Sequence, residues 1–177
     1  MSAFNVGTPN WLRDVSNIAD APGPAFRWGW DGLSRLPGGR RIFSQLAGML
    51  APFSGAVHPQ VLELGKGYGR VRMPYHRRVL NHIGCVHAAA FFDLAEFTAI
   101  ITLGYNIPDG ARLIVSGAQI RYLKKGRGDV LAICECPPIE SAERREFELP
   151  VRMENQDGEL LAGLKLNVLV GPTKGAA

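Results

Sequence analysis

The spacing of apolar residues predicts helices in the first third of the chain. After Thr8-Pro9, five apolar residues share one helical face: Trp11, Leu12, Val15, Ile18 and Ala19. The prolines within residues 21–24 end this helix, and a short turn around Asp31 follows. Five further residues predict the apolar stripe of a second helix: Ile42, Phe43, Leu46, Met49 and Leu50. We expect residues 1–55 to form a helical extension that packs on the main body. Since it holds all three tryptophans, it could also cover a ligand groove or contact a partner.

From Val57 the pattern changes to that of strands around one helix. Residues 62–73 predict a hairpin that turns at residues 65–67, and a nearly all-apolar helix follows from about residue 85 to 104. Further strands are predicted at 113–123, 130–136, 146–154 and 160–170. One long apolar helix between a hairpin and an antiparallel meander is an α+β pattern. The sheet must wrap around this helix, because few other elements can bury it.

Two carboxylates lie within this apolar helix, Asp93 and Glu96. Burying a carboxylate costs several kcal/mol unless partners compensate, so such a residue is either paired for structural reasons or placed for chemistry. The two are three residues apart and nearly share a face. We interpret Asp93 as a polar edge residue or a partner behind the reacting group, and Glu96 as the candidate for chemistry.

Composition excludes several classes of function. Hydrophobic residues make up 46% and charged residues 20% of the 177 residues, as in an ordinary single globular domain. The net charge of +4, with no Lys/Arg run longer than two, does not indicate nucleic acid but is compatible with an anionic small ligand. The longest apolar run, residues 97–103, is too short to span a bilayer, so we expect no membrane span.

Cysteine and histidine usage argues against disulfides and metal. The three cysteines, Cys85, Cys134 and Cys136, form no disulfide framework, and Cys134 and Cys136 face one side of a strand as small hydrophobes. No spacing typical of a metal site occurs, so we expect none. The first six residues lack the features of a signal peptide. We therefore expect reduced thiols and a cytoplasmic location.

Two motifs carry a resemblance to a known family. One reads Asn81, Gly84, His87, Ala88-Ala89 and then Leu94-Ala-Glu96; the other is Tyr122-Leu-Lys-Lys-Gly-Arg-Gly-Asp129. Both resemble motifs of the hotdog-fold acyl-CoA thioesterases, closest to the phenylacetate-degradation (PaaI-like) branch. The resemblance extends from about Val57 to Val170 and implies an antiparallel sheet around one central helix. We therefore expect a hotdog domain at residues 56–172, preceded by the extension.

The resemblance also implies an activity, the hydrolysis of a small or medium acyl-CoA without a cofactor beyond the coenzyme A of the substrate. Glu96 matches the family's general base or nucleophile, and Ala88 matches the backbone N–H that holds the oxyanion. Asn81 matches a residue that orients the water or the carbonyl, while Gly84 permits the tight turn into the helix. The family has Gly-Gly where this chain has Ala88-Ala89, and alanine narrows the approach to the backbone without removing its N–H donors.

A distance predicts the assembly. Ala88 and Glu96 are eight residues apart, which is about 12 Å along one helix. One carbonyl cannot contact both, since each contact needs about 3 Å. If both residues are catalytic, a second subunit supplies one of them, so we expect a homodimer or a dimer of dimers.

Other residues have both a functional and a structural interpretation. His82 and His87 bracket the helix start, where either could take a direct chemical role, His87 as a candidate catalytic residue, or could cap the helix and hydrogen-bond loop carbonyls. Cys85 lies near a helix N-terminus that would lower its pKa. Lys124, Lys125 and Arg127 either remain solvated or meet the phosphates of coenzyme A, and Arg77-Arg78 before the helix could meet those phosphates from the partner subunit. If Asp93 is not purely structural, we expect it to help bind the substrate.

Two alternative functions remain open at the level of sequence. A hotdog dehydratase would resemble a different signature, with a proline-containing motif after the histidine, whereas Ile83-Gly84 follows His82 here. A non-catalytic binding protein for acyl-CoA or a fatty acyl chain would tolerate Ala88-Ala89, and the tryptophan-bearing extension would then be its effector surface.

Overall fold

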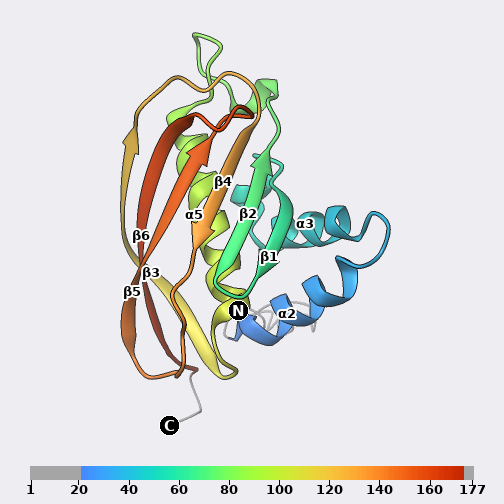
Figure 1. Cartoon of the computed structure of the whole chain (residues 1–177), viewed down its shortest axis with the longest axis vertical. Helices are drawn as coiled ribbons and strands as arrows, with labels where there is room; N and C mark the ends of the chain where they lie inside the picture. Colours follow the sequence, from blue (N-terminus) through green and yellow to red (C-terminus); the bar gives the residue numbers. More distant parts are fainter. Residues whose placement is uncertain (1–20, 174–177) are drawn as a thin grey trace, which may run out of the picture.

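The computed structural model describes residues 21–173 of the chain (Figure 1). Their elements, in order, are α2 (Pro22–Leu33), α3 (Gly39–Leu50), α4 (Pro52–Gly55), β1 (Gln60–Gly65), β2 (Tyr68–Met73), the 3-10 turn η1 (Arg77–Val79), α5 (Ala88–Asn106), β3 (Ala111–Tyr122), β4 (Val130–Glu135), β5 (Arg145–Glu154) and β6 (Leu160–Pro172). The first predicted helix, with Trp11 to Ala19, lies outside the described residues.

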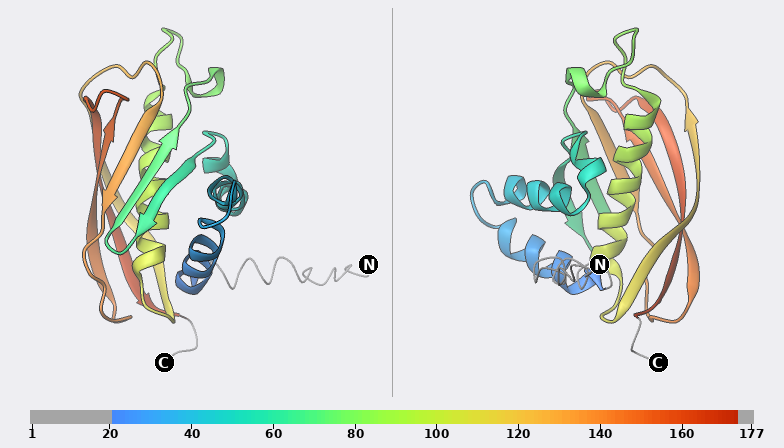
Figure 2. Two further views of the ribbon diagram at one scale, coloured as in Figure 1. Left: turned by 45° about the vertical axis from the view of Figure 1, so that its right-hand side comes forward. Right: turned by 180° about the vertical axis from the view of Figure 1, so that it is seen from behind.

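The six strands form one antiparallel sheet in the order β1-β2-β4-β5-β6-β3. The sheet curves around α5, and α2–α4 flank that helix on one side only (Figure 2). The predicted α+β architecture is therefore confirmed, and each predicted strand is present within two residues of its expected ends. The central helix begins at Ala88 and ends at Asn106, three residues later at its start and two at its end than the apolar pattern indicates.

Helix α5 is the core of the molecule. Leu94, Ala95, Ala99 and Leu103 have no exposed surface. The hydroxyls of the buried Thr98 and Thr102 each donate to the carbonyl four residues earlier at 2.6 Å, so no water is needed to satisfy them. By length and hydropathy α5 would pass as a membrane span, yet 67% of its most apolar window is buried within the protein.

Two turns are built as their residues predict. The β1–β2 hairpin turns through Gly67 at φ +74°, a conformation that favours glycine. In the β5–β6 turn, the Asn155 side chain accepts from the N–H groups of Asp157 and Glu159 at 3.0 and 2.8 Å.

The prediction of a short turn around Asp31 is wrong, because this residue lies within a helix. Helix α2 begins at Pro22 and runs through Trp28 and Trp30 to Leu33. Proline is tolerated in the first helical turn because the N–H it lacks would have no intrahelical partner there. Trp30 is buried against Phe43 of α3, with the ring centroids 5.2 Å apart, whereas Trp28 is 84% exposed.

The second predicted helix is present as α3, but its apolar stripe does not face the body as expected. Its buried residues are Gly39, Phe43, Ser44, Ala47 and Gly48. Ile42, Leu46, Met49 and Leu50 are exposed. Small residues form the buried face because α3 packs closely on α4 and β1: a Cβ on Gly55 of α4 would lie 2.8 Å from the Gly48 carbonyl oxygen.

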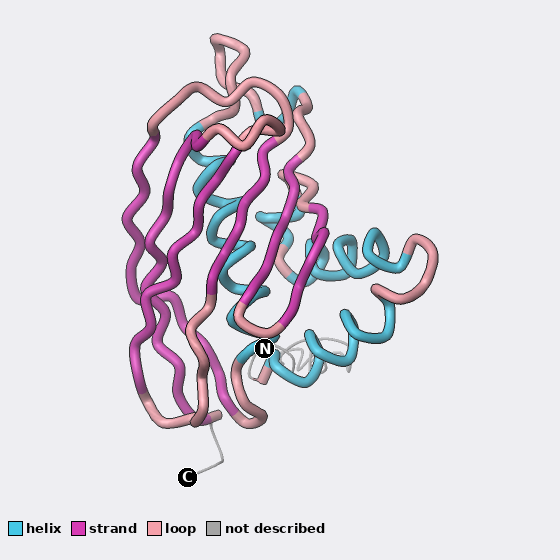
Figure 3. The backbone as a smooth tube through the Cα atoms, viewed as in Figure 1, coloured by secondary structure: helices cyan, strands magenta, loops and turns pink. Residues whose placement is uncertain are grey.

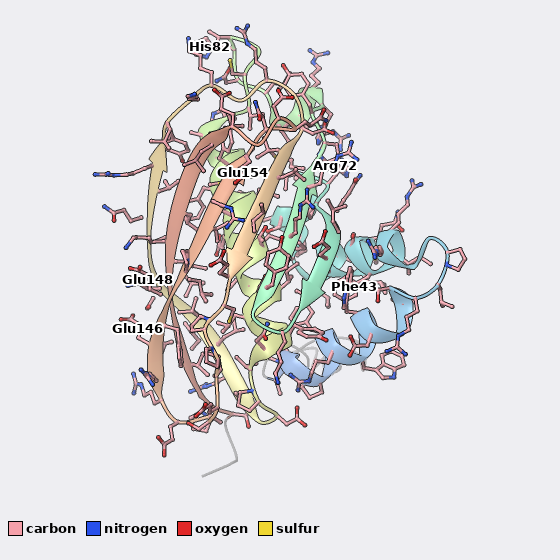
Figure 4. All side chains as sticks on the ribbon, viewed as in Figure 1. Phe43, Arg72, His82, Glu146, Glu148 and Glu154 are labelled. Atoms are coloured by element: carbon pink, nitrogen blue, oxygen red, sulfur yellow. The ribbon has the colours of Figure 1, made fainter. Side chains whose placement is uncertain are left out.

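Loops gather at one end of the molecule, and this positions the candidate site. Figure 3 shows the loops that precede α5 and that join β3 to β4 meeting at that end. The Val86 N–H donates to the Gly126 carbonyl at 2.9 Å, and this hydrogen bond joins the two loops. His82 lies at the outer part of this end (Figure 4).

Candidate active site

One stripe of α5 is not buried by the rest of the described chain. Ala88 and Ala89 are exposed, while Phe92, Glu96 and Ile100 are half-buried. Their spacing of four residues places them along one face of the helix. Seen from behind, α5 lies in front of the sheet, between the N-terminal helices and the β3 edge (Figure 2). A partner or ligand can therefore reach the helix along this face.

Glu96 is the carboxylate on this stripe. Burial raises its pKa above the usual range of a glutamate, and the nearby charge of Asp93 raises it further. A carboxylate whose pKa is raised towards neutrality is a better proton acceptor in a water-activating role than an ordinary surface glutamate.

Asp93 lies deeper, with only 3% of its surface exposed. The Ser54 hydroxyl of α4 donates to Asp93 Oδ1 at 2.7 Å, and Oδ2 has no partner among the described residues. Burial raises the pKa of Asp93, which the Ser54 hydrogen bond partly offsets. Asp93 therefore lies behind Glu96 and acts on it through charge. The edge interpretation of Asp93 is wrong, because α4 covers it.

The start of α5 offers one N–H donor that is free within the described residues. His87 is the N-cap, and its Nδ1 accepts from the Ala89 N–H at 3.0 Å. The Ala88 N–H, at the first helical position, has no acceptor among residues 21–173. Because the helix dipole adds positive potential at this point, the exposed Ala88 N–H is suited to a developing oxyanion.

Asn81 and Gly84 shape the loop that leads to this donor. Asn81 Oδ1 accepts from the N–H groups of Ile83 and Cys85 at 3.1 and 3.0 Å, so this oxygen holds the loop. Gly84 has φ +68°, and its carbonyl accepts from the Tyr75 hydroxyl at 2.6 Å. The prediction that Gly84 permits the tight turn agrees with this backbone conformation.

The predicted basic residues divide into two groups. Lys124 forms an ion pair with Glu159, Lys125 is exposed, and Arg127 lies beside Cys85, which raises the pKa of the guanidinium. Arg77 instead lines a separate cleft with Arg41 and His58, which Lys124, Lys125 and Arg127 do not line. Arg77 and the basic loop of residues 124–127 therefore lie in different places on one subunit, and a contact of Arg77 with coenzyme A phosphates bound to the partner subunit stays a prediction.

Asp129, at the end of the second motif, is a structural residue. It accepts from the Tyr75 N–H at 2.8 Å, pairs with Arg72 of β2 and accepts from Gln156. Burial acts to raise its pKa, but these hydrogen bonds and the Arg72 charge outweigh it and lower the pKa. Asp129 thus holds the loop before β4 against the end of β2.

Two contacts at the site could not be read from the sequence. Ser54 reaches Asp93 from the extension, and the Tyr122 hydroxyl donates to the Ala88 carbonyl at 3.1 Å. Neither pairing follows from spacing, because 39 and 34 residues separate the partners. The Tyr122 ring also meets Phe91 edge to face, with centroids 6.2 Å apart, which fixes β3 against the start of α5.

The cysteines do not join this site as nucleophiles. Cys85 is buried, and burial raises the pKa of both Cys134 and Cys136 to about 12. Such thiols stay protonated at neutral pH. Within the part of the chain that the structure describes, no three His, Cys, Asp or Glu side chains are grouped to hold a metal ion.

An antiparallel sheet wrapped around one long helix is the hotdog fold, and solved structures share it. One described as genomics APC5556 is 28% identical, covers 92% of this chain and 99% of its own, and has a TM-score of 0.68. PA5026 of Pseudomonas aeruginosa, described as a protein of unknown function and probable thioesterase, has a TM-score of 0.68 at 22% identity, over 77% of this chain and 97% of its own. Thioesterase HI1161 of Haemophilus influenzae has a TM-score of 0.66 at 15% identity, over 78% of this chain and 94% of its own.

These likenesses confirm the predicted hotdog fold. The chain belongs to the family described as Domain of unknown function (DUF4442), which matches residues 39–170. This match begins at α3, so it includes part of the predicted extension. No curated protein matches the chain. The nearer likeness to the phenylacetate-degradation branch stays a prediction.

Proposed function

We propose that this protein hydrolyses the thioester of a small or medium acyl-CoA and acts as a homodimer. The observation that carries the proposal is Glu96, a half-buried carboxylate with a raised pKa on the one open stripe of an otherwise buried helix. The solved neighbours described as thioesterases support the same class of reaction.

In the proposed reaction, ionised Glu96 takes a proton from a water molecule as that water attacks the thioester carbonyl. The carbonyl oxygen becomes an oxyanion, which accepts a hydrogen bond from the Ala88 N–H. The intermediate collapses with cleavage of the C–S bond. The proton held by Glu96 then goes to the departing thiolate, which leaves a free acid and coenzyme A. Direct attack by Glu96 on the carbonyl is the alternative first step.

The proposed site and the sheet edge both support the proposed dimer. Ala88 and Glu96 are about 12 Å apart along α5, so one thioester needs Glu96 of one subunit and Ala88 of the other. Strand β3 supports this assembly, because among the described strands it pairs with β6 alone, and its other edge, 12 residues long, has no described partner. Ile114, Val115 and Tyr122 on this strand are exposed, and a long apolar edge favours pairing with a second copy.

Substrate binding is proposed for the basic loop between β3 and β4. Lys125 and Arg127 are exposed beside the start of α5 and could meet the phosphates of coenzyme A, with Lys124 contributing once it leaves Glu159. These contacts would weaken with salt. Asp93 takes no direct part in binding here, because Ser54 and α4 cover it.

Free-thiol release from short, long and aromatic acyl-CoAs tests the proposal. Wild type should turn over at least one of them, and Glu96→Gln should lose about 10²–10⁴-fold in kcat, the contribution of a general base. Glu63→Gln, which removes an exposed carboxylate from β1, is the matched control and should keep full activity. Acyl-CoA binding without turnover would contradict the proposal and favour a binding protein.

A further inference from the structure

A second cleft lies apart from the open stripe of α5. It has a volume of about 900 Å³ and opens between α3, the α4–β1 connection and the η1 turn. Neither Glu96 nor the start of α5 lines it. Its volume is within the range of small-molecule sites, about 300–1,000 Å³.

The lining of this cleft is strongly cationic. Arg41 of α3 and Arg77 and Arg78 of η1 contribute guanidinium groups, and no Asp or Glu is among its described lining residues. None of these three arginines takes part in an ion pair within residues 21–173. Three arginines without counter-charges in one concavity produce a positive potential that attracts anions.

Two histidines lie in the same wall. The rings of His58 and His76 meet edge to face, with centroids 4.9 Å apart. His76 Nε2 is buried and has no hydrogen-bond partner among the described residues. An imidazole nitrogen in this position costs free energy unless something pairs with it.

His58 also adopts a strained backbone conformation. Its φ of +52° makes it the one non-glycine residue with positive φ in the described chain. Such conformations cost about 1–3 kcal/mol and concentrate at functional sites. Here the conformation places the His58 ring against His76, just before the start of β1.

The opposite wall is fixed in place by hydrogen bonds. The Ser44 hydroxyl of α3 donates to the Arg40 carbonyl at 2.7 Å and accepts from the Val61 N–H at 2.8 Å, which ties α3 to β1. Gln45 and Gln60 add amide groups to the lining. The cleft therefore has a rigid wall, cationic side chains and neutral donors, which together suit a small anion.

We propose that this cleft binds the phosphate groups of a small phosphorylated molecule. Each guanidinium group can donate two parallel hydrogen bonds to a pair of phosphate oxygens. Three arginines and two imidazoles supply more donors than a single carboxylate ligand can accept, which favours phosphate over carboxylate as the ligand. The phosphate could belong to coenzyme A or to a free phosphorylated metabolite. The proposal does not rest on the proposed hydrolysis, since none of its residues belongs to the Glu96 site.

Calorimetric titration with inorganic pyrophosphate at low ionic strength tests the proposal. The double variant Arg41→Ala/Arg78→Ala should bind at least about tenfold more weakly than wild type, because each removed group makes charge-assisted hydrogen bonds. The control Arg35→Ala/Arg144→Ala removes two exposed arginines elsewhere and should stay within about twofold of wild type. His76→Gln, which changes no arginine, should also weaken binding. Thermal unfolding of each variant checks that it is folded.

Three further ligands distinguish the two sources of phosphate. Coenzyme A, 3′-dephospho-coenzyme A and pantetheine are titrated into the same variants. Tight binding of coenzyme A that falls on loss of the 3′-phosphate, and falls again in the arginine variant, assigns the cleft to the carrier. Binding of pyrophosphate by wild type without binding of coenzyme A assigns it to a free metabolite. Equal loss in the cleft and control variants, or no binding by wild type, would overturn the proposal.

Discussion

Asp93 and Glu96 are three residues apart on α5, but their burial and their hydrogen-bond partners differ. Asp93 is held under α4 by one hydrogen bond from Ser54, with its second oxygen unpaired. Glu96 lies on the open stripe, and its pKa is raised by burial and then by Asp93. The inner carboxylate therefore tunes the outer one.

Replacing Asp93 should make the protein more stable at neutral pH. Because the folded-state pKa of Asp93 is raised, its contribution to stability is present below the ordinary aspartate pKa and is lost as pH rises through the raised value. Asp93→Asn removes the charge and can still accept from Ser54. A gain of about 1 kcal/mol at pH 7 would raise the Tm by roughly 2–4 °C.

Thermal unfolding from pH 4 to pH 8 measures this effect. The advantage of Asp93→Asn should shrink as the solution becomes acidic, whereas Asp157→Asn, in the exposed β5–β6 turn, should match wild type throughout. A variant less stable than wild type at pH 7 would show that the Asp93 charge is compensated.

At this scale the sequence identifies the carboxylates but not their partners. Asp93 and Glu96 stand out because they interrupt an apolar helix. Ser54 does not, since a lone serine in the extension carries no signal of a contact made 39 residues away. The cationic cleft lined by Arg77 was also not predictable, because Arg41 and His58 reach it from elements whose arrangement the spacing of residues along the sequence does not determine.

Close approach of β2 to α5 sets the packing between elements. A Cβ at Gly69 would lie 2.0 Å from Thr102 Oγ1, and the Thr102 hydroxyl is already bonded to the Thr98 carbonyl. The β-branched Thr102 has little rotamer freedom in a helix, so it cannot easily move away. Gly69 is therefore required for the sheet to wrap around α5.

Gly69→Ala should destabilise the protein by about 1–3 kcal/mol, the usual cost of overpacking. Denaturant unfolding measures the change. Gly163→Ala is the control, because a Cβ there meets nothing closer than the Val151 carbonyl oxygen at 3.9 Å. Gly69→Ala should cost less stability in a Thr102→Ala background than in the wild-type background, because the clash with the Thr102 hydroxyl is then absent. Equal losses in the two backgrounds would refute the contact.

The alternation of apolar and polar residues predicted the strands of the sheet well. The spacing of apolar residues predicted the buried faces of the helices in the extension poorly. Alternation in 146–154 and 160–170 fixes which face of each strand is buried, since one face must meet α5. The extension packs only partly on the body, so its apolar residues need not face inward. Leu46 and Met49 of α3 are accordingly exposed, while Ala47 and Gly48 are buried.

For the whole molecule, the open β3 edge is the expected subunit contact. Ile114→Lys/Val115→Lys places two charges on that edge and should convert the dimer to a monomer, because charged side chains block edge-to-edge pairing. Sedimentation velocity measures the mass. Glu63→Lys on β1, at the other edge of the sheet, should leave the dimer intact. A dimer that survives the β3 substitutions would place the contact elsewhere.

The site proposed here is shared between subunits, and two inactive variants can test this. Glu96→Gln removes the base. Ala88→Pro removes the N–H donor at the first helical position, where proline is well tolerated, and the extended His87 (φ −67°, ψ 142°) suits a following proline. Each homodimer should lose activity but keep its fold.

Thiol release by the mixed dimer is the most direct measurement. In a dimer of one Glu96→Gln and one Ala88→Pro subunit, one site carries both lesions and the other carries none. Random exchange of equal amounts should therefore restore about a quarter of wild-type activity, since about half of the dimers are mixed and each has one intact site. No restoration, with exchange verified by mass, would contradict a site built from Glu96 of one subunit and Ala88 of its partner.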